Sequence, residues 1–367
     1  MIERRTFARA LAVGLTLFVF TLGCSKKDAG DSNAEGQKGP SAKEISLSGA
    51  GATFPFPLYS KWMSEYNKLH PNVQINYQSI GSGGGIRQIT SGTVDFGATD
   101  APMSEADEKK APSKILHVPT TIGSVVVAYN VPSVASGLKL DGALVADIFL
   151  GKVKKWNDAR IAQLNEGVKL PDLDISVVNR SDGSGTTAVF TDYLAAVSPE
   201  WKEKVGVGKA VKWPLGLGAK GNEGVTGQVK TTPGSIGYME AAYANQNKMS
   251  HAAIKNKSGQ FVAAKPDAAT AAAAGRTMPD QLYVSLADAE GEGAYPIASY
   301  TYLLVYQEAV DKTKGEALAN FLWWAIHDGQ KYAAELDYAP LPAEVIQKLE
   351  ARIQGLAHQG KPLLSPR

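Results

Sequence analysis

Short runs of β-branched and aromatic residues recur along the chain, separated by longer segments in which apolar positions return at helical spacing. Three such runs, Val73–Tyr77, Ser124–Tyr129 and Ile175–Val178, have the length and composition typical of strands. Strands that alternate with helices along a sequence predict an α/β organisation. The pattern starts near Glu44, and the folded region is therefore expected to begin there.

Helical periodicity is clearest in the segment Pro55–His70, which Pro71 ends. Its apolar side chains recur every four residues, at Leu58, Trp62 and Tyr66. A second apolar stripe predicts a helix near the C-terminus, with Leu318, Phe321, Leu322 and Ala325 on its buried face. The alanine-rich stretch Ala263–Gly275 is expected to be a surface helix or loop without a functional role.

The N-terminal segment has the features of a targeting sequence. Three arginines, the last of them Arg9, precede an apolar run from Ala10 to Gly23 that is too short to span a bilayer comfortably. Residues 1–23 are therefore predicted to be a signal peptide. The adjacent pair Arg4 and Arg5 resembles a twin-arginine signal, and such pairs also occur in ordinary secretory signals, so both export routes remain open.

Cys24 is the only cysteine of the chain, which excludes an intramolecular disulfide. Its place directly after Leu22 and Gly23 resembles a bacterial lipobox, although Thr21 departs from the aliphatic residue usual there. This context predicts lipidation of Cys24 and attachment to a lipid bilayer, and an unmodified cysteine is the alternative. Residues 24–43 are almost free of apolar residues and are expected to be a disordered tether.

Length and charge narrow the class of protein. The chain has 367 residues, 44% of them hydrophobic, which favours two domains over one compact core. It carries 38 basic and 36 acidic residues, and the part that follows residue 23 has 35 of each sign. Neutrality argues against nucleic acid as the main partner. Any anion site must therefore work through local dipoles and a few placed charges.

Four segments share one character, in which a strand-like run ends in small and hydroxyl-bearing residues and a helix is expected to begin directly afterwards. Glycines there let backbone N–H groups approach a ligand, and helix N-termini attract anions. Each segment is therefore a potential anion-binding loop. They are Gly49–Pro55, with Pro55 in the first helical turn, Ile80–Gly85, Asp95–Asp100 and Arg180–Thr186.

Taken singly, each of these loops has a simpler interpretation. A glycine-rich stretch is often a turn, and a serine, threonine or aspartate before a helix is often its N-cap. Arg180 could form an ordinary surface ion pair with Asp182. Only the co-occurrence of the four loops in one chain favours a binding site.

Together these loops resemble those of the PstS family, the periplasmic phosphate-binding proteins of bacterial phosphate ABC transporters. The resemblance covers nearly all of the chain after the tether. Beyond the loops, it includes Tyr77-Gln78, Gly151–Trp156, Lys212–Pro214, Gly216–Gly218, Lys220–Asn222 and Leu336–Ala339.

The resemblance implies a ligand set for inorganic phosphate. Carried over position by position, it consists of Thr53, Phe54 through its backbone N–H, Ser82, Asp100, Arg180, Ser184, Gly185 and Thr186. Asp182 matches the partner that holds the arginine. Gly83 and Asn179 depart from residues found in some relatives, at positions that match no direct ligand.

The resemblance also implies the architecture and setting. The expected fold is a two-lobed α/β periplasmic binding protein of type II, with two mixed-sheet lobes joined by two crossover strands. One lobe would comprise residues 45–122 and 296–367, and the other residues 123–295. The protein is expected to be a periplasmic monomer without enzymatic activity, cofactor or metal, which delivers phosphate to the permease subunits of an ABC transporter.

Asp100 is the residue expected to make the site select phosphate over sulfate. An ionised carboxylate repels an anion unless the ligand contributes a proton to share, and phosphate carries one at neutral pH while sulfate does not. Asp100 is therefore expected to select protonated phosphate by penalising fully ionised competitors.

Three alternatives remain at this stage. In an enzyme, Ser184 or Ser82 would be a nucleophile, although neither lies in a G-x-S-x-G motif, and the five histidines lack metal-ligand spacing. A binding protein for sulfate or molybdate would leave Asp100 unexplained. A purely structural surface protein would leave the combination of Arg180, Asp100 and the glycine-rich loops unexplained.

Overall fold

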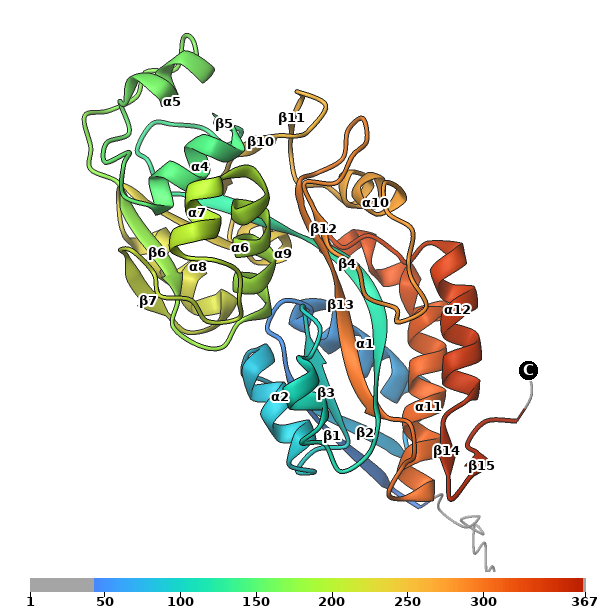
Figure 1. Ribbon diagram of the computed structural model, residues 1–367. Helices are drawn as coiled ribbons and strands as arrows, with labels where there is room; N and C mark the ends of the chain where they lie inside the picture. The colour runs from blue at the N-terminus through green and yellow to red at the C-terminus, as the bar shows by residue number, and fades with distance from the viewer. Residues whose placement is uncertain (1–42, 366–367) are drawn as a thin grey trace, which may run out of the picture. The chain divides into compact units, whose positions relative to one another are not determined.

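The computed structural model describes residues 43–365 (Figure 1). The predicted signal peptide, the tether up to Ala42 and the lipidated Cys24 lie outside the described residues. Within residues 43–365, no helix is both long and apolar enough to cross a membrane.

Helices and strands alternate along the described chain, as the sequence pattern predicts. The helices are α1 (Phe56–Leu69), α2 (Ser82–Thr90), α3 (Glu105–Glu108), α4 (Gly142–Phe149), α5 (Ala159–Leu164), α6 (Gly185–Val197), α7 (Pro199–Lys204), α8 (Gly221–Thr231), α9 (Ala241–Gln246), α10 (Pro266–Ala274), α11 (Lys312–Ile326) and α12 (Ala343–Gln354), with 3₁₀ turns η1 (Asp328–Tyr332) and η2 (Ala334–Leu336). The strands are β1 (Ile45–Gly51), β2 (Val73–Ser79), β3 (Phe96–Thr99), β4 (Ile115–Tyr129), β5 (Lys139–Leu140), β6 (Ser176–Arg180), β7 (Leu217–Ala219), β8 (Ser235–Glu240), β9 (Ser250–His251), β10 (Ala253–Lys255), β11 (Phe261–Val262), β12 (Leu286–Ala287), β13 (Ile297–Tyr306), β14 (Ala357–His358) and β15 (Lys361–Pro362).

The main sheet runs in the order β2-β1-β3-β13-β4-β8-β6-β7. Parallel pairs form at both ends, where β1 lies between β2 and β3, and β6 lies between β7 and β8. The long strand β4 connects the two regions, because it pairs with β13 up to Ser124 and with β8 from Val125. Figure 1 shows β4 and β13 side by side between two lobes. The predicted two-lobed α/β fold with crossover strands is confirmed.

Helices cover both faces of the sheet in the lobe built on β1. Leu47 of β1 packs in the same apolar cluster as Trp62 of α1 and Phe321 of α11. Ala50, three residues further along β1, belongs to a separate cluster with Ile86 of α2. Because side chains alternate between the faces of a strand, α1 and α11 cover one face and α2 covers the other.

The same layering occurs in the lobe built on β6 and β8. At Gly237 of β8, an added Cβ would meet Val225 and Val229 of α8. The next residue, Tyr238, stacks on Phe190 of α6, with ring centroids 4.4 Å apart. Consecutive residues of a strand face opposite sides, so α8 and α6 cover opposite faces of this sheet.

Helix α1 confirms the predicted helix, with Leu58, Trp62 and Tyr66 buried. Its start differs by one detail, because Pro55 is the N-cap and Pro57 occupies the first turn instead. A proline is tolerated in either place, since the first helical N–H groups have no partner within the helix.

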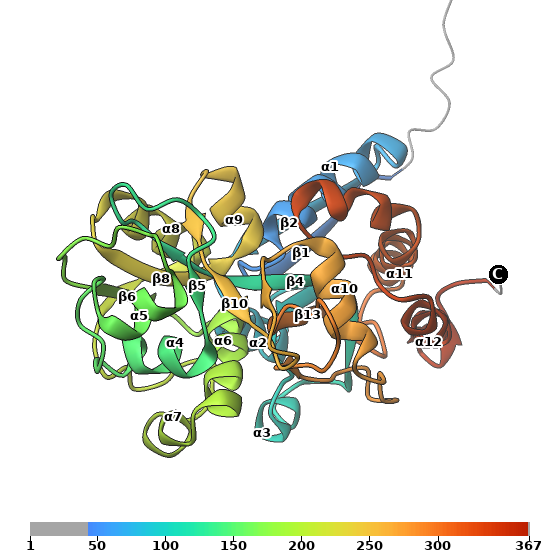
Figure 2. The same cartoon turned by 90° about the horizontal axis from the view of Figure 1, so that it is seen from above.

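The alanine-rich segment forms a helix with exposed residues, as one of the two predicted alternatives, but one of its faces is buried. It forms α10, and Ala268, Ala269, Ala272 and Ala273 of this helix are buried. The helix packs against β4 and β13, the strands that connect the lobes (Figure 2). Small side chains let the helix lie close to these strands, which composition alone does not reveal.

Close packing of α2 against β1 makes Gly85 sensitive to substitution. A Cβ at this position would lie 2.5 Å from Gly51 Cα, 2.6 Å from Ala50 O and 2.8 Å from Ala98 O. Because these are backbone atoms that cannot rotate away, Gly85→Ala is expected to lower the free energy of unfolding by about 2 kcal/mol or more. Denaturant titration monitored by circular dichroism measures this change.

The matched control is Gly227→Ala in α8, where a Cβ would meet nothing within 4 Å. This variant is expected to be stabilised slightly, by up to about 1 kcal/mol, because alanine favours helices over glycine. Equal free energies of unfolding for the two variants would show that α2 can shift away from β1 without a loss of stability.

Candidate ligand-binding site

The four predicted loops lie at the carboxyl ends of β1, β2, β3 and β6. Three of them lead into a helix as expected, namely α1, α2 and α6. The third loop does not, since α3 begins only at Glu105, with Ser104 as its N-cap. The prediction of a helix directly after Asp100 was therefore wrong.

The structure brings the predicted site residues together in the interior. The side-chain groups among them are all buried: Thr53, Ser82, Asp100, Arg180, Ser184 and Thr186. The Ser82 hydroxyl accepts a hydrogen bond from the Gly185 amide at 3.0 Å, although the two residues are 103 positions apart. A backbone hydrogen bond from Gly83 N to Gly183 O, 2.8 Å long, joins the second and fourth loops beside it.

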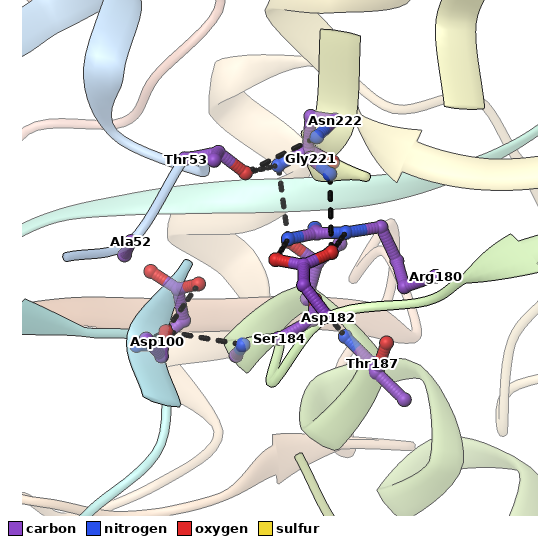
Figure 3. Close-up of polar contacts among 12 residues, drawn as sticks. Ala52, Thr53, Asp100, Arg180, Asp182, Ser184, Thr187, Gly221 and Asn222 are labelled. Carbon is purple, nitrogen blue, oxygen red and sulfur yellow. Dashed lines mark hydrogen bonds and ion pairs between the residues drawn. The ribbon is translucent and has the colours of Figure 1, made fainter. Parts of the chain in front are cut away.

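Arg180 and Asp182 form a two-point ion pair (Figure 3). The Nε and Nη2 atoms of Arg180 donate to the two carboxylate oxygens of Asp182, at 2.8 and 2.6 Å. The remaining nitrogen, Nη1, lies 3.4 Å from the Thr186 hydroxyl. One edge of the guanidinium is therefore fixed by the carboxylate, which orients the other edge toward the hydroxyl group.

Asp182 is held in its charged form by these contacts. Burial alone would raise its pKa, but the hydrogen bonds and charge of Arg180 hold the pKa below its usual value. The Gly221 amide adds a further hydrogen bond to Asp182 Oδ1, at 3.1 Å. Asp182 thus stays ionised beside the Arg180 side chain, which is only 1% exposed.

Helix α6 directs its N-terminus into the site. Ser184 is its N-cap, and the Ser184 hydroxyl accepts a hydrogen bond from Thr187 N at 3.0 Å. At Gly185 an added Cβ would lie 2.4 Å from both Asp100 Oδ2 and Ser82 Oγ, so the backbone must approach these groups without a side chain. The helix dipole adds positive potential here.

Asp100 lies opposite this helix end and is 2% exposed. Thr301 donates a hydrogen bond to its Oδ1 at 2.8 Å, and the Ser82 hydroxyl lies 3.4 Å from its Oδ2. Burial raises the pKa of Asp100 to about 7, an effect that the Thr301 hydrogen bond and the charge of Arg180 offset only in part. Asp100 can therefore exist in either protonation state near neutral pH.

This pKa predicts a pH-dependent stability for the ligand-free protein. A carboxyl group whose pKa is raised on folding stabilises the native state at low pH, and that contribution is lost as pH rises toward 7. When the pH rises from 5 to 8, the free energy of unfolding of the unaltered protein is expected to fall by about 2 kcal/mol relative to that of Asp100→Asn, which has no carboxyl group to titrate at this position. Urea unfolding at both pH values measures the difference.

The control for that experiment is Asp172→Asn, which removes an exposed carboxylate paired with Lys155. This change is expected to leave the slope of stability against pH nearly unaltered, because exposed pairs contribute little. If Asp100→Asn and the unaltered protein showed the same slope, Asp100 would not titrate in this range.

Two site residues escaped the sequence analysis. Asn222 donates through Nδ2 to the hydroxyls of Thr53 and Thr186, at 2.7 and 3.1 Å, and so links residues from separate loops (Figure 3). Thr301 is the residue of β13 that donates to Asp100. The string Lys220–Asn222 contributed to the family resemblance, which was the only sequence signal for Asn222.

The arrangement is a cluster of inward-facing hydrogen-bond donors around one titratable acid. Such a cluster can replace the hydration shell of a small oxyanion, and Arg180 supplies the opposite charge. Neither the Ser82 nor the Ser184 hydroxyl is hydrogen bonded to a histidine within residues 43–365. In the same residues, no three His, Cys, Asp or Glu side chains gather in a way that could hold a metal ion.

The fold and this buried donor cluster define a class of protein, the two-lobed solute-binding proteins. The sequence profile of the PBP superfamily domain matches residues 31–328. A phosphate-binding protein from Stenotrophomonas maltophilia shares the fold, with a TM-score of 0.65 and 20% identity over 84% of this chain and 94% of that chain.

Sequence relatives identify the family within this class. The phosphate-binding protein PstS of Pasteurella multocida (strain Pm70) is 49% identical over 309 residues, which are 83% of this chain and 89% of the relative. PstS of Xylella fastidiosa (strain 9a5c) is 44% identical over 356 residues, 94% of this chain and 97% of the relative. The chain belongs to the PstS family of phosphate-binding proteins, as its motifs predict.

Proposed function

We propose that this protein captures inorganic phosphate in the cleft between its lobes and delivers it to the permease subunits of a phosphate ABC transporter. The observation that carries the proposal is the fixed Arg180 fork, which faces a buried acid across a ring of hydroxyl and amide donors. Family membership supports the same ligand and the same transport role. In this role the protein binds its ligand without changing it.

The ligand set follows from the donors at the site. Phosphate oxygens would accept from hydroxyls, from backbone amides at two helix N-termini and from Arg180 Nη1, while the phosphate proton would be donated to Asp100. The proposed ligands are Thr53, Phe54, Ser82, Asp100, Arg180, Ser184, Gly185 and Thr186.

The lobes are proposed to comprise residues 45–122 with 296–367, and residues 123–295. The exchange of pairing partners along β4, between Ser124 and Val125, supports a boundary close to the first of these limits. Ligand contacts on both lobes would favour the closed form, as in a hinge-closing receptor. Small-angle X-ray scattering with and without phosphate tests this closure, and identical scattering curves would contradict it.

The cellular setting is also a proposal. A signal peptide ending at Gly23 and a lipidated Cys24 would place the protein in the periplasm on a membrane anchor, after export by either route. Mass spectrometry of the N-terminal peptide tests the anchor, and an unmodified Cys24 would contradict it. We further propose that the protein acts as a monomer, and light scattering of the purified protein tests this through its mass. We also propose that it needs no cofactor.

The test of the function is calorimetric titration of the purified protein, after removal of bound ligand, with phosphate and sulfate in separate runs at neutral pH. Tight one-to-one binding of phosphate without a sulfate signal is the expected result. Binding of sulfate alone would overturn the choice of ligand. Binding of neither anion would favour the enzyme hypothesis instead.

A further inference from the structure

Glu240 lies behind the Thr53–Phe54 segment and is connected to it along separate routes. It is the last residue of β8 and is fully buried. Its backbone N–H donates to Asn222 Oδ1 at 3.1 Å, which fixes the orientation of that side-chain amide. Asn222 Nδ2 then points at the Thr53 hydroxyl, 2.7 Å away.

The second route runs through α9. The Glu240 carboxyl group is the N-cap of this helix and accepts a hydrogen bond from Ala242 N at 2.8 Å. The first turn of α9 carries Tyr243, whose hydroxyl donates to the Thr53 carbonyl oxygen at 2.6 Å. The helix cap thus sets the position of a hydroxyl group that holds the Thr53 backbone.

The third route runs through Tyr338. Its hydroxyl donates to the Phe54 carbonyl oxygen at 2.7 Å and lies 3.1 Å from Glu240 Oε2. A tyrosine hydroxyl has one proton, and a carbonyl oxygen can only accept. When Tyr338 donates its only proton to the Phe54 carbonyl oxygen, its hydroxyl oxygen can only accept from Glu240. A hydrogen bond between the two side chains then requires a proton on the Glu240 carboxyl group.

The surroundings of Glu240 favour that protonated form. Its Oε1 atom is buried without a hydrogen-bond partner, which is costly for a charged group. Burial raises the pKa of Glu240 well above its usual range, an effect that the hydrogen bonds with Ala242 and Tyr338 offset only in part and that the nearby Asp337 reinforces. The other titratable groups that face it are the hydroxyls of Tyr338 and Tyr243, whose own pKa values burial raises.

We propose that Glu240, as a neutral acid, is a positioning residue that fixes the Thr53–Phe54 segment for ligand binding. The proposal rests on phosphate binding by this segment. Loss of the side chain would release the α9 cap and the Tyr338 hydroxyl together, so the backbone of Thr53 and Phe54, including the Phe54 amide, would no longer be held toward the ligand.

Calorimetric titration with inorganic phosphate tests this role in the purified protein. Glu240→Ala and Tyr338→Phe are each expected to weaken phosphate binding about tenfold or more, because each leaves a buried polar group without its partner. Glu240→Gln is expected to lose less affinity than Glu240→Ala, about threefold, because its amide oxygen can take the place of Oε2 and still accept from Ala242 N, although that oxygen cannot also donate to Tyr338. Tyr306→Phe, which removes a hydroxyl bonded to Ile89 O away from the site, is the control and is expected to bind normally.

The outcomes separate this proposal from the proposed function. Failure of the unaltered protein to bind phosphate would overturn the proposed function, and this inference with it. If the unaltered protein binds, two results would overturn the inference alone: binding by Glu240→Ala within about twofold of normal, or equal losses for Glu240→Gln and Glu240→Ala. If Glu240→Ala does not fold, the other variants still test the proposal. Normal phosphate binding by Tyr338→Phe would contradict it.

A double variant tests whether the two residues act along one route. Glu240→Ala combined with Tyr338→Phe is expected to lose less affinity than the product of the single losses, because both changes free the same segment. Losses that simply multiply would show that Tyr338 and Glu240 act independently, against the proposal.

Discussion

Arg180→Ala is expected to weaken phosphate binding about a thousandfold, the largest effect of any single substitution at this site. Arg180 supplies the only cationic side chain among the proposed ligands, and Asp182 fixes one edge of it through two hydrogen bonds. Its removal takes away the charge-assisted hydrogen bonds to the ligand and leaves the Asp182 carboxylate partly buried without its partner. Calorimetric titration with phosphate measures the loss.

Two further variants sharpen this experiment. Arg180→Lys keeps the positive charge but cannot span both Asp182 oxygens, and so an intermediate loss is expected. Arg160→Ala removes an exposed arginine of α5 with its own carboxylate partners and is expected to bind normally. Normal binding by Arg180→Ala would place the ligand elsewhere.

Asp100→Asn is expected to relax the discrimination between phosphate and sulfate by about a hundredfold at pH 8. Above its pKa of about 7, the Asp100 carboxylate repels a fully ionised anion and accepts the phosphate proton. An asparagine carries no charge and donates through its amide, so sulfate is no longer penalised. Competition of sulfate against bound phosphate measures the ratio.

The same pKa makes a prediction for the unaltered protein. Below pH 7 Asp100 gains a proton and becomes a donor itself, and sulfate is therefore expected to compete better at pH 5 than at pH 8. In Asp100→Asn, competition by sulfate is expected to lose this dependence on pH. Unchanged affinities for both anions in Asp100→Asn would contradict the account of selectivity.

The loops of the candidate site could be found from the sequence because an anion-binding loop needs particular residue types at neighbouring positions. Thr53, Ser82 and Ser184 each stand where a strand gives way to a helix, and such positions favour hydroxyl residues and glycine. The Arg180-x-Asp182 spacing likewise suffices to place a carboxylate on a guanidinium. Short-range patterns thus pointed to the candidate loops, whereas the set of proposed ligands came from the family resemblance.

The expected helix after Asp100 shows where local signals were misjudged. Pro102 disfavours helical backbone at Ala101, and α3 starts only after Ser104 provides a cap. The error left the candidate site intact, because the proposed role of Asp100 rests on its side chain, directly after β3, and not on a helix N-terminus.

The sequence by itself determined the alternation of strands and helices, the donor loops and, through the family motifs, the proposed ligand. Only the tertiary structure decided which distant groups complete the site, since Asn222 and Thr301 reach Thr53 and Asp100 across 169 and 201 positions. It also decided the pKa values of Asp100 and Glu240, which burial raises. The physical reason is that the cost of burying a charge depends on all the groups packed around it, and those come together only in the folded chain.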